Sequence, residues 1–323
     1  MSFFKELNIN YRCGSKNFYS GRKSQFKNLY WHQKLEFSNI EKFQKNLCNT
    51  IGLIGYVCDE GVKRNQGRIG ARKGPKSIRN SLGKIPVHFI DKKIIDYGDL
   101  ICVGNDLEDC QKALSLSIKK LINNKIFPIS LGGGHDIAIG NFNGIKDAIS
   151  NTPKNKIGII NFDAHFDLRT VETKPNSGTP FNQILNKNKT TSYFAIGIQK
   201  QSNDRNLFKI ANQLKVSYVS NFECETFTSS LQKKLIDFID KVDYLYLTID
   251  LDGFSSAYAP GVSAPSPLGF NPSFVFKALD FILMSKKLIS CDIAELNPDF
   301  DIDNKTSVLA ARLLDHIIQN LKL

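Results

Sequence analysis

The segment IGIINFDAHFDLR, residues 157–169, combines two patterns that decide the fold class and point to a site. Its first four residues are apolar, as in a strand that is buried on both faces of a parallel sheet. From residue 161 onward polar and apolar residues alternate, which predicts a strand with two different faces. The polar positions are Asn161, Asp163, His165, Asp167 and Arg169. Because Asp is depleted in strands and buried charges need compensation, we interpret this face as functional rather than merely solvated.

The composition of the chain is that of an ordinary globular protein. Its 323 residues allow one large α/β domain or two small ones, and 41% are hydrophobic and 23% charged. No CxxC pair occurs, and the odd number of cysteines indicates free thiols in a reducing compartment. The seven are Cys13, Cys48, Cys58, Cys102, Cys110, Cys224 and Cys291. The N-terminal sequence has no signal-peptide pattern and no apolar run is long enough to span a membrane, so we expect a cytoplasmic protein without a membrane partner.

A formal net charge of +12 is compatible with nucleic-acid binding. The lysines are dispersed among asparagines, however, and neither a zinc-finger motif nor an RNA-binding aromatic motif is present. We interpret the charge as a lysine-rich solvated surface that mildly attracts anionic substrates, and we expect no nucleic-acid partner.

Beyond the first fifty residues, apolar segments of β type alternate with helical patterns. The predicted strands lie within 51–59, 93–98, 125–135, 156–167, 192–199, 215–220, 243–254 and 288–298. The predicted helices cover 75–83, 106–122, 136–149, 204–214, 225–240, 271–285 and 306–320. This order predicts a three-layer αβα fold with a mainly parallel sheet of roughly eight strands. Residues 1–50 are aromatic, basic and aperiodic, and we expect an N-terminal arm packed on a single α/β domain of residues 51–323.

Three further predicted strands end in polar groups, as the opening segment does. One ends in three glycines and His135, one presents Asp250 and Asp252, and one ends at Glu295. In open parallel sheets ligands bind outside the carboxyl ends of the strands, so these side chains are expected at one site. Each motif alone is weak, because an Asp-x-Asp pair is more often a capped turn and a single histidine is often a hydrogen-bonded core residue.

The glycine-rich segment does not fit a nucleotide site, but the polar set as a whole fits metal ions. A dinucleotide fingerprint needs glycine at Ile137, and a P-loop needs a Gly-Lys-Ser/Thr ending. Four clustered carboxylates would repel one another, and two divalent cations carry the matching charge. Oxygen-rich ligands favour Mn²⁺ over Zn²⁺, with iron, cobalt and nickel as alternatives, and such a pair lowers the pKa of a bridging water. The candidate ligands are His135, Asp163, His165, Asp167, Asp250 and Asp252.

These motifs resemble those of the ureohydrolases, the arginase/agmatinase superfamily of dimanganese enzymes. The similar segments are GGGHD, NFDAHFDLR, TIDLDGFSSAYAPGVSAPSPLGF and DIAELNP, in the family's order from about residue 50 to the C-terminus. The resemblance implies an arginase-like fold, two Mn²⁺ per chain and a homo-oligomer, either a trimer or a hexamer. By position, the implied ligands are His135 and Asp167 for one manganese, His165 and Asp252 for the other, and Asp163 and Asp250 for both.

The resemblance also implies contacts to the substrate. Glu295 corresponds to the carboxylate that pairs with the substrate's guanidinium or amidinium, and Ser177 to a contact of the substrate carboxylate in arginases. Asp167 corresponds to a catalytic residue that relays a proton. Phe181 stands where arginases carry a histidine proton shuttle, and GGGHD replaces the GGDHS of agmatinases. Both differences argue against arginase and agmatinase activity.

Within the superfamily, the chain is most similar to the formimidoylglutamases of histidine degradation. The similar features are Arg169, APGVSAP at 259–265, and YSGR and WHQ in the arm. This implies hydrolysis of N-formimidoyl-L-glutamate to L-glutamate and formamide. The substrate has a cationic amidine and two carboxylates, which suits Glu295 for the amidine and the bidentate guanidinium groups of Arg169 and Arg72 for the carboxylates. The simpler alternatives are that Arg169 only neutralises surplus acid and that Arg72 is a surface arginine.

Two other functions remain open at this point, besides the more distant alternative of a basic nucleic-acid binder. One is a ureohydrolase that acts on a guanidino compound, as an arginase, guanidinobutyrase or agmatinase does. The other is a non-catalytic homologue, which we would expect to lack a metal ligand, whereas all six candidate ligands are present.

Overall fold

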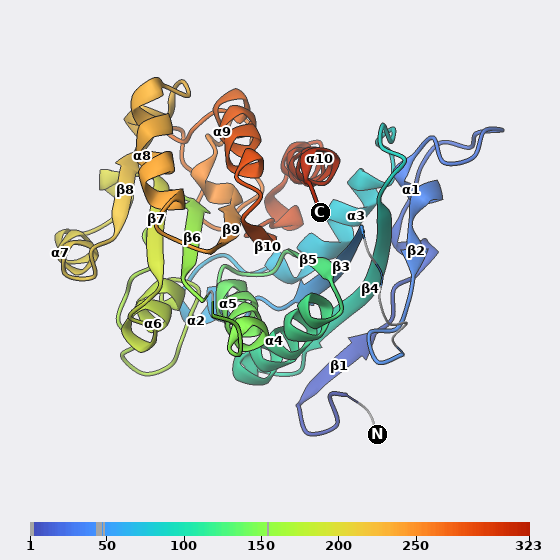
Figure 1. Ribbon diagram of the computed structural model, residues 1–323, viewed down its shortest axis with the longest axis horizontal. Helices are drawn as coiled ribbons and strands as arrows, with labels where there is room; N and C mark the ends of the chain where they lie inside the picture. The colour runs from blue at the N-terminus through green and yellow to red at the C-terminus, as the bar shows by residue number, and fades with distance from the viewer. Residues whose placement is uncertain (1–2, 43–46, 48, 154) are drawn as a thin grey trace.

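The computed structural model describes residues 3–42, 47, 49–153 and 155–323, and its centre is one ten-stranded sheet (Figure 1). The strands follow the order β1-β4-β3-β5-β10-β9-β6-β7-β8, and β2 pairs with β4. Every pairing is parallel except that of β1 with β4. The mainly parallel sheet predicted from the alternation is therefore confirmed, with two more strands than expected because the arm contributes β1 and β2. The bounds are β1 Ile9–Arg12, β2 Glu36–Phe37, β3 Thr50–Val57, β4 Lys93–Cys102, β5 Ile126–Leu131, β6 Ile157–Phe162, β7 Ser192–Ile198, β8 Ser217–Ser220, β9 Tyr244–Asp250 and β10 Leu288–Ala294.

Helices cover both faces of the sheet, which gives the expected three layers. One face carries α3 (Gly74–Leu82), α8 (Ser229–Ile239), α9 (Pro272–Met284) and α10 (Lys305–Asn320). The other carries α4 (Leu107–Asn123), α5 (Ile137–Ile149), α6 (Pro180–Lys187) and α7 (Arg205–Gln213). Periodicity predicts all of these but α6, and it also misses α1 (Trp31–Lys34) and α2 (Glu60–Arg64), which have only four and five residues. Within the described ranges, none of the helices combines the length and the apolar character that crossing a membrane requires.

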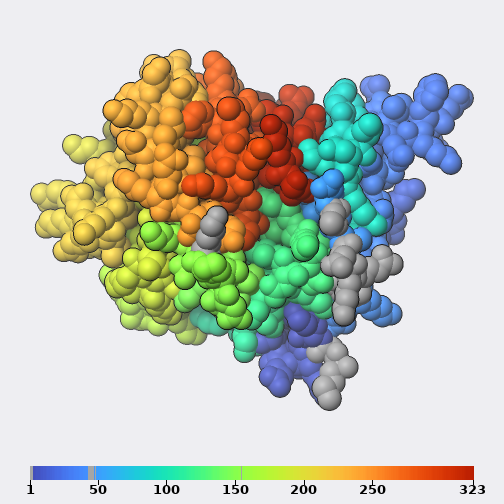
Figure 2. Space-filling model, in the orientation of Figure 1, coloured from blue at the N-terminus to red at the C-terminus, as the bar shows by residue number. Residues whose placement is uncertain are grey.

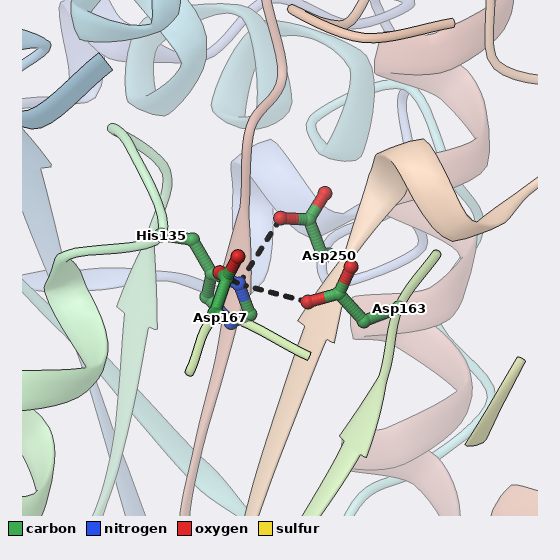
Figure 3. Close-up of side chains that lie close together, drawn as sticks. All are labelled: His135, Asp163, Asp167 and Asp250. Atoms are coloured by element: carbon green, nitrogen blue, oxygen red, sulfur yellow. Dashed lines mark ion pairs between the residues drawn. The ribbon is translucent and has the colours of Figure 1, made fainter. Parts of the chain in front are cut away.

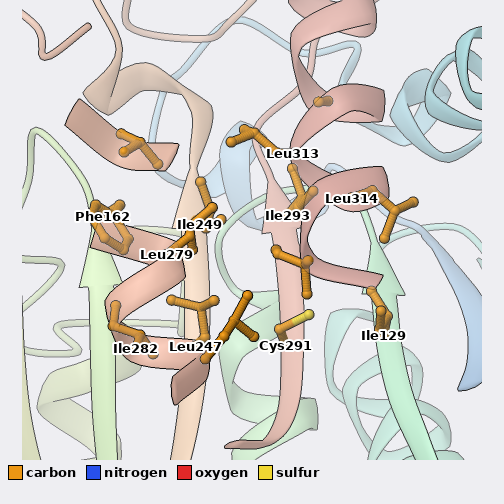
Figure 4. Packing of buried hydrophobic residues seen from close by; sticks show 14 of the residues in the cluster. Ile129, Phe162, Leu247, Ile249, Leu279, Ile282, Cys291, Ile293, Leu313 and Leu314 are labelled. Carbon is orange, nitrogen blue, oxygen red and sulfur yellow. The ribbon is translucent and has the colours of Figure 1, made fainter. Parts of the chain in front are cut away.

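An apolar core packs between the central strands and the helices on one face of the sheet (Figure 4). Leu247 and Ile249 of β9 and Ile293 of β10 are fully buried, and they pack against Leu279 of α9 and Leu313 of α10. Burial of each such side chain stabilises the fold by about 1.5–3 kcal/mol. The strand ends that follow this core therefore have fixed positions.

The N-terminal arm is joined to the sheet through a buried charge cluster. Arg79 of α3 is fully buried and pairs with two carboxylates of β4, at 2.7 Å to Asp96 and 2.5 Å to Asp99. From the arm, the hydroxyl of Tyr19 donates to Asp96 and the guanidinium of Arg12 donates to Asp99. The arm lies at the opposite end of the molecule from α7 (blue and yellow in Figure 2). Six cysteines are free thiols, and Cys48 lies outside the described residues.

The alternating strand predicted for residues 161–169 ends early. β6 stops at Phe162, which packs in one core, whereas Phe166 and Leu168 pack in the core on the opposite face of the sheet. A continuous strand would place all three on one face. The prediction of an extended polar face is therefore wrong beyond residue 162.

Side-chain hydrogen bonds explain why the chain turns instead. A carboxylate oxygen of Asp163 accepts a 2.6 Å hydrogen bond from the backbone of His165, and Asp167 has a φ angle of 49°. After β9, Asp250 accepts a 2.8 Å hydrogen bond from the backbone of Asp252 in the same way. Such local bonds compete with a β ladder and produce turns.

Candidate metal centre and substrate cavity

The polar side chains predicted at strand ends do come from neighbouring strands. β5, β10, β9 and β6 are adjacent in the sheet. His135, Glu295, Asp250 and Asp163 lie at or just beyond their carboxyl ends. Because these strands are parallel, the four residues meet at one edge of the sheet.

The glycines before His135 let the chain turn back against β3. Gly132 and Gly133 have positive φ angles of 60° and 91°. A Cβ on Gly133 would lie 2.6 Å from the carbonyl oxygen of Tyr56, so a larger residue would push the loop away. Gly134 donates a 3.1 Å hydrogen bond to the carbonyl of Cys58. The loop is thereby fixed, and it places the buried His135 side chain among the carboxylates.

Three carboxylates surround Nδ1 of His135 (Figure 3). The distances are 3.1 Å to Oδ2 of Asp163, 2.8 Å to Oδ2 of Asp167 and 3.1 Å to Oδ2 of Asp250. One donor atom from each of the four residues lies within 4.8 Å of the others. One imidazole nitrogen and three carboxylate oxygens form a donor set that a divalent cation can bind.

A second group shares Asp163 with the first. Nδ1 of His165 lies 3.1 Å from Oδ2 of Asp252 and 3.5 Å from Oδ1 of Asp163. Asp163 therefore presents one oxygen to each group. Asp250 belongs to the first group, and its Oδ1 accepts the hydrogen bond from Asp252. The arrangement thus gives Asp163 a position shared by both groups, and the bridging role that the resemblance implies for Asp250 stays a prediction.

A buried hydrogen-bond network that begins at Nε2 orients the imidazole ring of His135. Its Nε2 lies 3.0 Å from the hydroxyl of Thr248, which donates to Asp292 at 2.6 Å. Because Thr248 gives its proton to Asp292, it accepts from Nε2–H, which leaves Nδ1 of the neutral ring free to bind a cation. Tyr246 and Asn141 also donate to Asp292. Burial raises the pKa of Asp292 to about 6 in spite of these hydrogen bonds.

Glu295 is buried, is 4% exposed and lines the same cavity. Its φ angle is 66°, and its backbone N–H donates to Gly133 at 2.9 Å. Oε1 accepts a hydrogen bond from the backbone of His135, whereas Oε2 is buried without a hydrogen-bond partner. Burial raises the pKa of Glu295 well above its usual value, and the charges of Asp250 and Asp252 raise it further. A cationic group in the cavity would favour the ionised form.

The residues of this site fit a pair of divalent ions. Burial and the charge of Asp163 raise the pKa of Asp167 to about 6, and burial and Asp250 raise that of Asp252 well above its usual value. Nδ1 of His135 and Oδ1 of Asp252 are buried without an aligned hydrogen bond. Unpaired buried polar atoms are costly, and divalent ions would satisfy them and favour the ionised carboxylates.

A cavity of about 320 Å³ opens onto the two groups. Besides Glu295 and all the candidate ligands except Asp163, its polar lining includes Asn65, Arg68, Arg169 and Ser177. Arg169 donates from Nη1 to Oδ1 of Asn65 at 3.0 Å, and Nδ2 of Asn65 donates to the hydroxyl of Ser177 at 3.2 Å. Both predicted contacts to a substrate carboxylate, Arg169 and Ser177, thus face the cavity that contains the candidate metal ligands.

Arg72 is not at the cavity, which corrects the prediction that it contacts the substrate. It is exposed in a short 3-10 helix (Ala71–Lys73), and the chain changes direction just before it at Gly70, where φ is 137°. Arg68 of the same loop lines the cavity instead. Its guanidinium donates to the backbone carbonyls of Ser263 at 3.0 Å and Val262 at 2.6 Å.

The sequence patterns did not single out Asn65 and Arg68. These residues lie between β3 and α3 without a motif of acids or histidines, but β3 neighbours β5, so the strand-end rule extends to this loop. Phe181 is fully buried and stacks on Tyr193 with ring centroids 4.4 Å apart. Of the five histidines, all in the described part of the chain, only His135 and His165 line the cavity.

Comparison with known proteins agrees with this fold. A family model described as the arginase family matches residues 49–319. A formimidoylglutamase from Geobacillus sp. (strain WCH70) is 40% identical over 306 residues, which cover 93% of this chain and 94% of the relative.

Solved structures show the same fold. The crystal structure of formimidoylglutamase from Bacillus subtilis has a TM-score of 0.81 at 21% identity, covering 93% of this chain and 94% of that one. The structure of Trypanosoma cruzi formiminoglutamase with Mn²⁺ has a TM-score of 0.72 at 23% identity, covering 84% and 93%. With the family model matching most of its length, the chain belongs to the arginase family.

Proposed function

We propose that this protein hydrolyses the C–N bond of N-formimidoyl-L-glutamate and releases L-glutamate and formamide. The observation that carries the proposal is the pairing of opposite charges in one cavity. Glu295 offers a buried oxygen without a partner, and Arg169 makes no ion pair with any residue that the structure describes. The substrate carries the complementary groups, an amidinium and two carboxylates. The 40% identity to a formimidoylglutamase over most of both chains supports the same substrate.

We further propose that the site holds two Mn²⁺ ions. His135, Asp163, Asp167 and Asp250 would hold one ion, and Asp163, His165 and Asp252 the other. Sets of this kind, rich in oxygen and free of thiolate, favour hard ions such as Mn²⁺. When bound, the ions lower the pKa of a bound water, so that a nucleophile is available at neutral pH. Metal analysis of the purified protein, and reactivation after EDTA treatment with Mn²⁺, Zn²⁺, Co²⁺, Ni²⁺ and Fe²⁺ in parallel, test the identity of the ion.

The side chains of the cavity have distinct roles in this proposal. Oε2 of Glu295 accepts an N–H of the amidinium and orients the amidine carbon toward the metal ligands. Arg169 and Ser177 bind the carboxylate distal to the amidine, and Arg68, which lines the same cavity, binds the other one. The carboxylate of Asp167 accepts a proton during the reaction and passes it to the leaving amine.

A substrate panel tests the proposal directly. The Mn²⁺-loaded protein is assayed with N-formimidoyl-L-glutamate, arginine, agmatine and guanidinobutyrate. We expect the highest kcat/KM with formimidoylglutamate. A preference for a guanidino compound would replace the proposal by the other ureohydrolase activity, and failure to hydrolyse any of the four would indicate a non-catalytic homologue.

We also propose a cytoplasmic location and assembly into a trimer or hexamer. The location follows from the free cysteines, and the assembly from the resemblance to ureohydrolases. Light scattering on the purified protein tests the assembly, since the chain has a mass of 36.3 kDa.

A further inference from the structure

Asn65 lies between Arg169 and Ser177 and hydrogen-bonds to both side chains. We propose that Asn65 is a positioning residue that gives these two side chains the geometry of a carboxylate clamp, and we use this name for Asn65, Arg169 and Ser177 together. The inference rests on the proposed function, because it explains how that site selects a substrate with a carboxylate distal to the amidine.

Asn65 accepts one of its two hydrogen bonds and donates the other. Oδ1 of Asn65 accepts from Nη1 of Arg169 at 3.0 Å, which fixes the plane of the guanidinium and leaves its other N–H groups for an anion. Nδ2 of Asn65 donates to Oγ of Ser177 at 3.2 Å. Because Oγ accepts this bond, the hydroxyl proton of Ser177 is free to be donated to the same anion. Asn65 thus turns two donors toward one carboxylate.

The backbone around Asn65 is held by further contacts. The neighbouring Arg64 binds Glu60 at 3.0 Å, Glu108 at 2.6 Å and the carbonyl of Pro175 at 3.2 Å. These bonds tie the end of α2 to α4 and to the loop that carries Ser177. The backbone of Ser177 itself donates to Gly61 of α2 at 3.1 Å.

A backbone hydrogen bond also joins the two ends of the loop on which Arg169 and Ser177 lie. The backbone N–H of Arg169 donates to the carbonyl of Gly178 at 2.9 Å. A Cβ on Gly178 would lie 3.3 Å from Cδ of Arg169 and 3.3 Å from the amide atoms of Asn65. Glycine at this position therefore lets the clamp residues pack closely.

Only an amide side chain can make both hydrogen bonds in this arrangement. Aspartate at residue 65 would accept from Arg169 with a full charge, which competes with a substrate carboxylate for the guanidinium. It would also accept the hydroxyl proton of Ser177, so that this proton is no longer offered to the substrate. Asn65→Asp should therefore be worse for the clamp than Asn65→Ala, although it changes the size of the side chain less.

The experiment compares Asn65→Asp and Asn65→Ala on two substrates. One is N-formimidoyl-L-glutamate, and the other is N-formimidoyl-L-2-aminobutyrate, which lacks the distal carboxylate. With formimidoylglutamate we expect a rise in KM of about tenfold for Asn65→Ala and about a hundredfold for Asn65→Asp, or about 1.4 and 2.8 kcal/mol, with a smaller change in kcat. With the aminobutyrate compound, kcat/KM should change less than about threefold. The exposed Asn151→Asp is the matched control and should behave as the unmodified protein.

The outcomes separate this inference from the proposed function. Equal losses on both substrates would show a structural role and overturn the inference, as would an Asn65→Asp protein with unchanged KM. If the unmodified protein prefers arginine, the proposed function fails, and the clamp is tested with arginine against agmatine, which differ only by the carboxylate. If it hydrolyses none of these compounds, calorimetric binding of L-glutamate against L-2-aminobutyrate makes the same comparison, and an Asn65→Asp protein that binds both as the unmodified protein does would overturn the clamp.

Discussion

The backbone N–H of His135 donates a 2.8 Å hydrogen bond to Oε1 of Glu295, across 160 residues of sequence. One contact therefore links a candidate metal ligand to the carboxylate that we assign to the substrate's amidinium. Since Oε1 is occupied, Oε2 is the oxygen left for a cationic ligand. In the proposed function, the loop that follows β5 thereby sets the orientation of the substrate relative to the metal centre.

Replacement of Glu295 by glutamine tests this assignment. Glutamine retains an acceptor for His135 but carries no charge for the amidinium. Loss of a hydrogen bond to a charged group costs about 1.5–3 kcal/mol, so kcat/KM with formimidoylglutamate should fall by about 10- to 150-fold. Metal content should not change, since Glu295 is not a candidate ligand. The exposed Glu6→Gln serves as the control, and an unchanged kcat/KM for Glu295→Gln would remove Glu295 from the substrate site.

The sequence predicts the centre of the fold well because the signals there are local. β5, β6, β9 and β10 are largely apolar strands that are followed by polar groups, and the strand-end rule brings these groups together. The arm is different, because β1 and β2 are short and pair with residues far along the chain, such as Ile9 with Cys102. Nothing in the local pattern of the arm specifies such a partner.

Two features of the site also lie beyond the reach of local patterns. Residues 163–169 have the alternation of a strand, but the side chain of Asp163 captures a backbone N–H and the chain turns. Asn65 and Arg68 acquire their positions from hydrogen bonds to Ser177 and Ser263, which lie more than a hundred residues away. Both features depend on tertiary contacts, which cannot be inferred from the periodicity of a sequence.

The shared position of Asp163 predicts unequal effects on metal content. Asp163→Ala removes a donor from both groups and should leave neither ion bound, whereas Asp252→Ala removes a donor from one group only. Metal analysis per chain after gel filtration should give close to zero for the first variant and close to one for the second. Two ions remaining in Asp163→Ala would contradict the shared role.

The role of Arg169 is tested by Arg169→Lys and Arg169→Ala. Lysine keeps the charge but not the planar, bidentate donor geometry, so both variants should lose affinity for the substrate carboxylate. We expect kcat/KM with formimidoylglutamate to fall by about 10- to 150-fold for alanine, while both ions stay bound. Unchanged efficiency with full metal content would reduce Arg169 to a local counter-charge.

The raised pKa of Asp292 predicts how stability depends on pH. Burial moves this pKa from 3.8 to about 6, so the folded protein binds a proton that the unfolded chain has released. The stabilisation of the fold by this bound proton is therefore fully present below about pH 4, and it is lost as the pH rises through about 6. Asparagine does not titrate, so the free energy of unfolding of the unmodified protein, relative to Asp292→Asn, should fall with rising pH.

The size of this effect follows from the two pKa values. The difference between 3.8 and about 6 corresponds to about 3 kcal/mol in total, of which about 1.4 kcal/mol falls between about pH 5 and pH 7.5. Urea unfolding of both EDTA-treated proteins across this range measures it, with metal binding removed as a variable. If the difference in unfolding free energy between the two proteins is constant with pH, Asp292 does not titrate in this pH range.

The buried cluster around Arg79 predicts a large effect on stability far from the active site. Asp96 and Asp99 are buried, and Arg79→Met would leave them without their buried cation, which typically costs about 3–5 kcal/mol. Arg12 pairs with the same Asp99, but its side chain is 51% exposed, so Arg12→Met should cost less than about 1 kcal/mol. Urea unfolding of the two variants compares the same chemical change at a buried and at an exposed position. If both variants lose the same free energy of unfolding, the buried ion pairs stabilise the fold no more than a surface ion pair does. Other contacts would then hold the arm to the sheet.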